Sequence, residues 1–294
     1  MSDAGLANRY LELLKKSLLD LLYIENEARL IYLLQSVIAE TPVEEAVVRD
    51  IARHRPDIVE RLKSTRMSGE LSFVWPIGRA DGSTRPMNLR NVAEFYHTMI
   101  GKRRLDSIHE LLDRVIVDRI PGDLIETGVW RGGATIFMRG YLAAHGIRNR
   151  NVWVADSFAG VPAPTAPPDQ GHDFSASVLP ILAIPRAEVE ELFRRYDLLD
   201  DRVKFLEGWF KDTLPVAPIE RLALMRLDGD LYESTRDALV NLYHKLSPGG
   251  FVIVDDYNDF EPCKLAVDEF RTQVNERSPI QHVDWSAIYW CKGR

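Results

Sequence analysis

The fold is decided by residues 123–133, Asp-Leu-Ile-Glu-Thr-Gly-Val-Trp-Arg-Gly-Gly, near the middle of this 294-residue chain. A short apolar run, Asp123–Thr127, leads into a glycine-rich turn and then into a helical pattern that continues to about Ala144. A strand that passes through such a turn into a helix is the first half of a βαβ unit, and a series of these units builds a parallel sheet. The stretch therefore predicts an α/β fold.

Short apolar runs and helical runs continue to alternate from Gly122 to the C-terminus, as such a sheet requires. Right-handed crossovers between the strands would make it a doubly wound, Rossmann-like sheet with helices on both faces. The predicted strands are Asp123–Thr127, Val152–Asp156, Val203–Glu207, Leu222–Asp228, Phe251–Asp256 and Val283–Trp290. A turn is expected at Ser247–Gly250, and Ser234 is expected to cap the helix that precedes it.

The first 120 residues have a helical pattern instead. Apolar side chains recur at spacings of three and four from Tyr10 onward, and such a stripe faces a core or another subunit. Helices are predicted over Glu27–Ala39, Val43–His54, Pro56–Lys63, Val92–Ile100 and Ile108–Arg114, with a loop over Gly69–Pro86. We therefore expect a helical N-terminal region, residues 1–120, followed by a catalytic domain, residues 121–294.

The charge balance and the cysteines exclude several classes of protein. With 37 basic and 44 acidic side chains the formal net charge is −7, which gives no attraction to nucleic acid. No run of about 18 uncharged apolar residues occurs, so we expect neither a membrane span nor a signal peptide, and a cytoplasmic protein. Cys263 and Cys291 lack the spacing of a zinc site and are too few for a disulfide framework, so both are expected to be reduced thiols.

The glycine turn also indicates the type of cofactor. Gly128 permits a tight turn, and Gly132 with Gly133 would let a ligand approach the backbone. A dinucleotide-binding fingerprint needs glycine at position 126, where this chain has glutamate. Because the carboxylate of Glu126 would repel a pyrophosphate at a helix N-terminus but suits an ammonium group, the turn favours S-adenosylmethionine over NAD.

Two further strand ends supply candidate cofactor contacts. The second strand ends in Asp156, where an acid can accept hydrogen bonds from ribose hydroxyls, and Ser157 and Phe158 follow it. After the third strand, Gly208-Trp209-Phe210 could offer the adenine an apolar or stacking wall. An ordinary strand–helix connection would explain the glycine turn alone, but not its register with Asp156 and the later strand-end acids.

Acidic side chains end the fourth and fifth strands. Asp228 follows one of them, and Asp255 and Asp256 follow the other. Since adjacent parallel strands lie about 4.8 Å apart, the three carboxylates can converge on one cation, which would neutralise their repulsion. Oxygen-only ligands favour a hard ion such as Mg²⁺. The ion would bind a substrate hydroxyl, lower its pKa and hold it in line with the sulfonium methyl group.

Proton removal from that hydroxyl needs a base, and Asp228 and Asp230 are the nearest candidates. An alternative role for Asp230 is to bind the Glu233–Thr235 backbone at the start of the next helix. The strand-end aspartates could likewise be solvated turn or cap residues, which Asp generally favours. His172 and Asp173, in a Pro-rich excursion, are either substrate contacts in a mobile lid or plain loop residues.

At these residues the chain resembles the macrocin O-methyltransferase family, bacterial enzymes that methylate sugar hydroxyls of macrolide and aminocoumarin natural products. The most specific shared pieces are Glu126–Gly133, Asp156–Gly160, Leu227–Thr235, and Pro248–Phe251 with Asp255–Tyr257. The resemblance also covers about Arg9–Tyr32 and extends from Thr98 to the C-terminus. Residues 40–67 depart from the family pattern.

The resemblance implies a class I methyltransferase sheet, S-adenosylmethionine, a homodimer or higher homo-oligomer, and Mg²⁺ on Asp228, Asp255 and Asp256. It also implies that Thr98 and Met99 lie against the methionine end of the cofactor. In the family the N-terminal region helps to cover the acceptor pocket. Since residues 40–67 belong to that region, their departure leaves the acceptor sugar open.

The leading hypothesis is therefore metal-dependent O-methylation of a small-molecule hydroxyl, on a sugar attached to a natural product. A phenol or catechol is the alternative acceptor, because its more acidic hydroxyl would be activated more easily by the same cation. Two alternatives of a different class are a nicotinamide-dependent reductase, against which Glu126 argues, and a non-catalytic partner-binding protein with the same fold.

Overall fold

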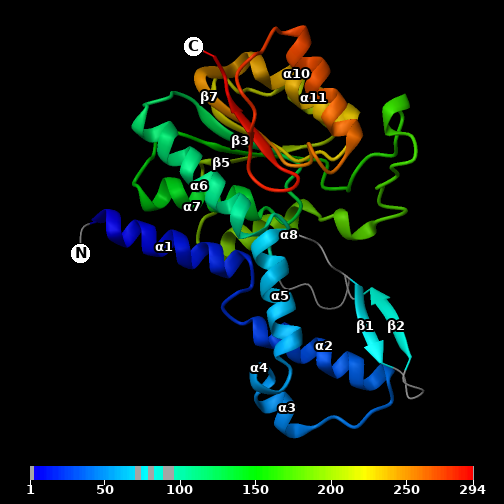
Figure 1. Ribbon diagram of the computed structural model, residues 1–294. Coiled ribbons are helices and arrows are strands. Elements are labelled where there is room, and N and C mark those ends of the chain that lie inside the picture. Colours follow the sequence, from blue (N-terminus) through cyan, green and yellow to red (C-terminus); the bar gives the residue numbers. More distant parts are fainter. Residues whose placement is uncertain (1–2, 70–73, 79–82, 89–95, 294) are drawn as a thin grey trace. The chain divides into compact units, whose positions relative to one another are not determined.

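The computed structural model describes residues 3–69, 74–78, 83–88 and 96–293 (Figure 1). The chain forms two compact units. Met1–Leu11 and Arg104–Arg294 make up the sheet unit, and Glu12–Arg103 make up the helical unit. Most of helix α6 (Gly101–Val117) thus belongs with the sheet, whereas the sequence pattern placed it in the N-terminal region.

The sheet unit contains a seven-stranded sheet in the order β5-β4-β3-β6-β7-β9-β8. Strands β3 to β7 run parallel to one another, and β9 and β8 are antiparallel additions at one edge. The strand bounds are β3 Asp123–Thr127, β4 Val152–Asp156, β5 Val203–Glu207, β6 Leu222–Leu227, β7 Leu246–Val254, β8 Gln281–His282 and β9 Ile288–Cys291. The predicted α/β, doubly wound class is confirmed. From β3 the chain adds β4 and β5 on one side of the sheet and then β6 and β7 on the other, so the strand order reverses between β3 and β6. In such a sheet a ligand crevice is expected beyond the carboxyl ends of the strands at this point.

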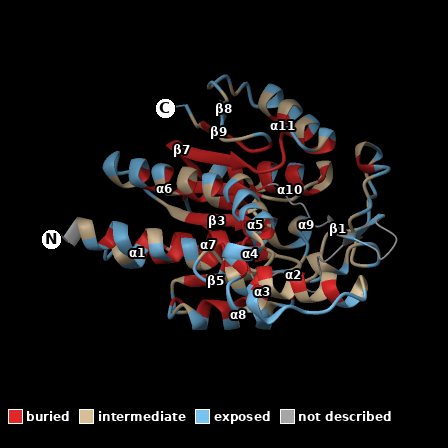
Figure 2. Ribbon diagram, turned by 60° about the horizontal axis from the view of Figure 1, so that its bottom comes forward, coloured by how far each residue is buried: buried red, intermediate tan, exposed pale blue. Residues whose placement is uncertain are grey.

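Helices cover both faces of this sheet (Figure 1). Helices α10 (Tyr232–Leu242) and α11 (Glu261–Gln273) share one apolar core with strand side chains such as Met225 and Val252. On the other face lie α6 and α7 (Gly133–Ala144), and α8 (Arg186–Arg195) packs Phe193 against Phe205 of β5. Figure 2 shows the buried residues concentrated on the strands, and every residue of β6 is buried, as expected for a central parallel strand.

Strand β7 begins earlier than predicted. Pro248 and two glycines indicated a turn over Ser247–Gly250, but these residues belong to the strand. Leu246 pairs with Leu222 of β6, and the Gly249 N–H donates to the carbonyl of Lys292 at 2.9 Å. Strand partners on both sides therefore override the local turn preference. Short elements complete this unit: α9 Phe210–Thr213 and the 3₁₀ turns Pro167–Asp169, Pro180–Leu182, Leu214–Val216 and Tyr243–Lys245.

The helical unit has its own core. Its elements are the later part of α1 (Asp3–Leu18), α2 (Ile24–Ile38), α3 (Glu45–Arg49), α4 (Ile51–His54), α5 (Pro56–Ser68), β1 (Val74–Gly78) and β2 (Thr84–Asn88). Side chains of α2 to α5, among them Ile31, Val47, Ile51 and Leu62, are buried together. Among the described residues, no helix of either unit is long and apolar enough to cross a membrane.

Three predicted elements of this unit differ from the structure. The helix predicted over Val43–His54 is two short helices, because Asp50 leaves the helical conformation and its carboxylate accepts the Arg53 N–H. The loop predicted over Gly69–Pro86 contains the hairpin β1–β2, whose two edge strands tolerate prolines. The helix predicted over Val92–Ile100 lies partly outside the described residues, and Tyr96–Ile100 is not helical.

Candidate active site

The glycine turn joins β3 to α7 at the centre of the sheet. Gly128 and Gly132 have φ angles of 82° and 79°, in the left-handed region that favours glycine. A Cβ atom at Gly128 would lie only 1.7 Å from the carbonyl oxygen of Asp228. Glycine is thus required here because the end of β3 packs directly against the end of β6, which brings the predicted cofactor turn next to a predicted metal ligand.

Asp156 ends β4 and holds the same turn in place. Its two carboxylate oxygens accept the N–H of Val129 at 2.7 Å and the N–H of Phe158 at 2.8 Å. Burial raises the pKa of Asp156, and these backbone donors oppose that shift. A carboxylate has about four acceptor positions, so ribose binding is compatible with this geometry. The Ser157 hydroxyl donates to the carbonyl of Gly160 at 2.7 Å and so serves its own turn.

The remaining predicted cofactor contacts are spread over several environments. Gly208 donates its N–H to the carbonyl of Asp156 at 2.9 Å, which places the Gly208–Phe210 segment beside β4. Trp209 is 36% exposed, whereas Phe210 packs against the core. Thr98 and Met99 belong to the helical unit, so their place at the cofactor remains a prediction.

The three strand-end aspartates come together as predicted. Ligand oxygens of Asp228, Asp255 and Asp256 all lie within 4.8 Å of one another. The backbone continues both strand ladders to this point, because the Asp228 N–H donates to Thr127 and the Asp255 N–H to Leu227, each at 2.9 Å. Asp255 and Asp256 are buried, and Asp228 is half-buried. The site is therefore a set of carboxylates withdrawn from water on two adjacent strands.

Asp230 lies in the same cluster. Its backbone is left-handed, with φ 57°, and its N–H donates to the Asp256 carboxylate at 3.1 Å. Burial, followed by the nearby charges of Asp228 and Asp255, raises the pKa of Asp230 to about 8. A carboxylate with this pKa can hold a proton near neutral pH, as a general base in an enzyme must after it has taken one.

A buried arginine, which the sequence patterns did not single out, connects the cofactor turn to these acids. Arg226 is fully buried in β6, and its guanidinium pairs with Glu126, with Asp255 and, at 2.7 Å, with Asp228. The other oxygen of Glu126 accepts the Thr135 N–H at 3.1 Å. Burial raises the pKa of Glu126 to about 8, and Arg226 opposes the shift. Glu126, which is predicted to bind the ammonium group of the cofactor, must therefore do so while its carboxylate is also paired with Arg226.

A second arginine reaches the cluster from α6. Arg104 pairs with Asp255 and donates to Asp284 at 2.8 Å. Burial raises the pKa of Asp255, but Arg104 and Arg226 outweigh it, so this pKa lies below its ordinary value. Asp256 is different, because no described arginine forms a salt bridge with it and Arg104 lowers its pKa only through its charge. Burial, followed by the charges of Asp228, Asp230 and Asp255, raises its pKa well above the ordinary value. The cluster therefore has more carboxyl groups than arginines, and their repulsion is relieved either by protonation or by a bound cation.

Comparisons with known proteins identify the family to which this site belongs. The family model described as macrocin-O-methyltransferase (TylF) matches residues 7–292. The chain belongs to the macrocin-O-methyltransferase family. The resemblance noted in the sequence is confirmed, and this protein is an O-methyltransferase.

Relatives and solved structures agree with the assignment of this O-methyltransferase. The demethyldecarbamoylnovobiocin O-methyltransferase of Streptomyces niveus is 52% identical over 206 residues, which cover 67% of this chain and 76% of that protein. A tetracenomycin-C 4'-O-methyltransferase of Streptomyces olivaceus, named for a dimethoxy-rhamnosyl substrate, is 49% identical and covers 74% of this chain and 84% of its own. The solved structure of the O-methyltransferase NovP is 40% identical, has a TM-score of 0.74, and covers 98% of this chain and 100% of its own.

Of the two arginines, only Arg226 left a signal in the sequence of this O-methyltransferase. A single charged residue interrupts the otherwise apolar run Leu222–Leu227, and a charge on a central strand must find a buried partner. Arg104 lies on an amphipathic helix among other charged residues, where nothing distinguishes it. Its partners Asp255 and Asp284 are far away in the sequence, so only the fold reveals the contact.

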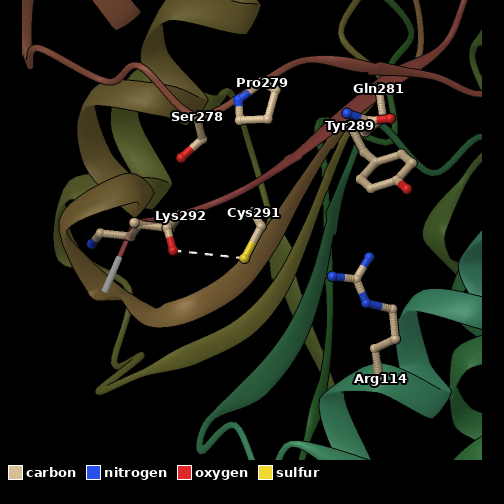
Figure 3. Close-up of a pocket in the computed structure, with 8 residues that line it drawn as sticks. Arg114, Ser278, Pro279, Gln281, Tyr289, Cys291 and Lys292 are labelled. Atoms are coloured by element: carbon tan, nitrogen blue, oxygen red, sulfur yellow. Dashed lines mark hydrogen bonds between the residues drawn. The ribbon is translucent and has the colours of Figure 1, made fainter.

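An open pocket of about 450 Å³ lies elsewhere in the sheet unit (Figure 3). Arg114 of α6 faces Tyr289 across it, and Cys291, the last residue of β9, and Lys292, which follows it, line another side. The Lys292 ammonium donates to the carbonyls of Tyr243 and Leu246 rather than into the pocket. None of the predicted site residues lines this pocket, so we assign it no part in the reaction.

Proposed function

We propose that this O-methyltransferase transfers the methyl group of S-adenosylmethionine to a hydroxyl on a sugar of a glycosylated natural product, with Mg²⁺ as its metal. The observation that carries the proposal is the convergence of Asp228, Asp255 and Asp256 within 4.8 Å beside the glycine turn. Relatives at 47–52% identity are named for the methylation of mycinamicin, a rhamnosyl-tetracenomycin and a novobiocin precursor. These names support a glycosylated acceptor rather than a free phenol.

The donor set fits the proposed metal. Oxygen ligands of three carboxylates suit a hard cation, and Asp256, which lacks an arginine partner among the described residues, is the carboxylate most in need of positive charge. When bound there, Mg²⁺ would stabilise negative charge on an acceptor hydroxyl and lower its pKa. Arg226 pairs with one oxygen of Asp255 and Arg104 with the other, and together they fix the orientation of that carboxylate.

The remaining proposed roles belong to the chain itself. Asp230, next to Asp256, would accept the proton of the acceptor hydroxyl, with Asp228 as the alternative base. Asp156 would bind the ribose, and Glu126 would contribute its remaining acceptor positions to the ammonium group of the cofactor. Gly128, Gly132 and the Gly208–Phe210 segment, with Ser157 and Phe158, would border the cofactor, and Thr98 and Met99 would cover its methionine end.

Methyl transfer from labelled S-adenosylmethionine tests this proposal. Glycosides and catechols are offered as acceptors, with Mg²⁺ and with EDTA. We expect transfer to a glycoside that EDTA abolishes. Activity on catechols alone would refute the sugar acceptor, and full activity in EDTA would refute the metal. Calorimetry that detects tight binding of NADH and none of S-adenosylmethionine would refute the cofactor.

We also propose that the protein acts in the cytoplasm as a homodimer or higher homo-oligomer. The family membership and the apolar side chains exposed along α1, including Leu6, Tyr10 and Leu13, support association. Sedimentation equilibrium of the full chain tests it. A monomer at micromolar concentration would contradict the proposal.

A further inference from the structure

Helix α10 lacks an N-cap of its own. It begins at Tyr232, directly after the Asp228–Asp230 segment, and the preceding residue, Leu231, has no side chain that can accept a hydrogen bond. The first amides of a helix nevertheless need acceptors. Asp169, which is 1% exposed, supplies them: its carboxylate accepts the Tyr232 N–H at 2.7 Å and the Glu233 N–H at 3.2 Å. The predicted alternative that Asp230 binds this backbone, and the prediction that Ser234 caps the helix, are wrong.

Asp169 comes from a long excursion between β4 and α8, residues 157–185, whose regular structure consists of two short 3₁₀ turns and one isolated bridge between Val161 and Ser175. Loops of this length in a compact domain are usually functional. This one is attached at several points. Thr165 donates to the Glu233 carboxylate, and the indole N–H of Trp130, in the glycine turn, donates to the carbonyl of Ile181 at 3.0 Å. The excursion therefore contacts both the cofactor turn and the helix that follows the acidic strand end.

Aromatic contacts add a third attachment. The ring of His172 lies 6.3 Å from that of Phe174, and Phe174 lies 5.2 Å from Phe260, which follows the acidic end of β7. The excursion starts at the carboxyl end of β4 and is held at residues that follow β3, β6 and β7. In a doubly wound sheet a ligand binds beyond these strand ends. The excursion consequently borders the crevice that the acceptor must enter.

We propose that Asp169 is a positioning residue that holds the excursion as a fixed wall of the acceptor pocket and sets the start of α10 behind Asp230. This inference rests on the proposed function, because it concerns the acceptor of that reaction. The carboxylate is well suited to the task, since it can accept two N–H groups and its charge is stabilised at a helix N-terminus. The excursion is thus a preset wall, in contrast to the mobile lid that the sequence suggested as one alternative.

The test compares Asp169→Asn with Asp200→Asn. Asparagine has the shape of aspartate, but its amide nitrogen cannot accept the second N–H, so the variant should fold while losing half of the attachment. Asp200 is the matched control, because it accepts the Arg202 N–H at 3.0 Å and pairs with Arg139, outside the excursion and the strand-end cluster. Both variants should lower the melting temperature. Only Asp169→Asn should speed amide exchange at Tyr232 and Glu233 and raise KM for the acceptor, each about tenfold.

The affinity for S-adenosylmethionine, measured by calorimetry, should stay within about twofold in both variants, because the carboxylates of Asp169 and Asp200 bind none of the proposed cofactor contacts. If Asp169 had a purely structural role, its replacement would lower the fraction of active enzyme without raising KM for the acceptor relative to the affinity for S-adenosylmethionine. An acceptor KM equal in Asp169→Asn and Asp200→Asn, in an active wild-type enzyme, would overturn the proposal. If the wild-type protein showed no methyl transfer, the proposed function would be refuted instead. In that case amide exchange would still test the role of Asp169, because an Asp169→Asn variant with unchanged exchange at Tyr232 and Glu233 would show that Asp169 does not hold the excursion to α10.

Discussion

Two buried groups of charged side chains, one in each unit, are built in opposite ways. In the helical unit, Glu27 and Arg66 form a pair in which one guanidinium nitrogen contacts both carboxylate oxygens, at 2.8 and 3.0 Å. Arg66 also lies over the ring of Tyr96, 3.9 Å from its centroid. The pair therefore joins one carboxylate to one guanidinium, and Asp20 is a further carboxyl group whose charge acts on both of them.

The cluster at the strand ends of the sheet unit is not balanced. Arg226 and Arg104 serve Glu126, Asp228 and Asp255 between them, and Asp256 and Asp230 add further carboxylates. A pair of the first type, Glu27 with Arg66, is neutralised by residues of the folded chain and requires no bound ion. In a cluster of the second type the carboxylates repel one another unless they are protonated or a cation binds, so the excess of carboxyl groups distinguishes a functional site from a structural tie.

Removal of Arg226 should have the largest effect on this comparison. Arg226→Met would leave Glu126 and Asp228 without their arginine partner and Asp255 with Arg104 alone, and breaking a buried ion pair from one side costs about 3–5 kcal/mol. Chemical denaturation measures the loss. Arg195→Met, which removes an exposed pair with Glu191, is the control and should cost less than about 1 kcal/mol. A loss for Arg226→Met as small as that of the control would show that the arginine does not hold the cluster together.

Removal of Asp256 should act on activity rather than on stability. Asp256→Asn deletes a carboxyl group whose pKa is raised by burial and by the neighbouring carboxylates, so the metal-free protein should be at least as stable as the wild type near neutral pH. Methyl transfer should fall by about a hundredfold or more, because a metal ion contributes several kcal/mol to charge stabilisation. Mg²⁺ should raise the melting temperature of the wild type and not of the variant.

The control for this variant is Asp123→Asn. Asp123 starts β3, at the end of that strand opposite the cluster, and accepts hydrogen bonds from neutral donors, Asn151 at 2.8 and 2.9 Å and the indole of Trp153 at 2.8 Å. It should lose stability and keep the Mg²⁺ dependence. An Asp256→Asn enzyme that retained full, Mg²⁺-dependent activity would remove this residue from the metal site.

The sequence predicted the parallel part of the fold well for a physical reason. Strands β3, β4 and β5 have the predicted bounds, because buried parallel strands are short apolar runs between turn residues. The predictions were wrong where partners far along the chain decide the structure. Ser247–Gly250 joins β7 through pairing on both sides, and the start of α10 is capped by Asp169 rather than by a neighbour. Local signals cannot reveal either contact.

The same distinction applies to the candidate site. The approach of Asp228, Asp255 and Asp256 followed from the geometry of adjacent strands and could be predicted. Arg104 could not be predicted, because it meets Asp255 only after α6 has packed on the sheet, and the charge of Arg226 in an apolar strand indicated a buried partner without showing which one. The sequence therefore suggested a cluster of acidic residues without arginines, whereas in the structure some of the acidic residues form salt bridges with Arg104 and Arg226 and others do not.

The balanced pair gives the smallest and most specific prediction, which concerns pH. Burial raises the pKa of Glu27 from 4.5 to about 7, and Arg66 opposes the shift. Between these two pH values the folded state holds a proton that the unfolded state has lost. Raising the pH through this window should therefore lower the free energy of unfolding, by at most about 3 kcal/mol, with no further change above it. Glu27→Gln cannot ionise and should lack this loss, so its stability relative to the wild type should increase from pH 4.5 to 7.

Thermal unfolding of both proteins across pH 4–8 measures the difference, and Glu60→Gln is the control. Glu60 is exposed on α5 of the same unit and pairs with Lys63 at 2.9 Å, so its replacement should change stability by less than about 0.5 kcal/mol. Curves for wild type and Glu27→Gln that run parallel across the window would mean that Arg66 fully offsets the burial of Glu27. The Glu27–Arg66 pair would then carry no net cost of desolvation. Of the two buried groups, only the strand-end cluster, which is proposed to bind the metal, would be destabilised by its buried charges, so the contrast between them would be sharper.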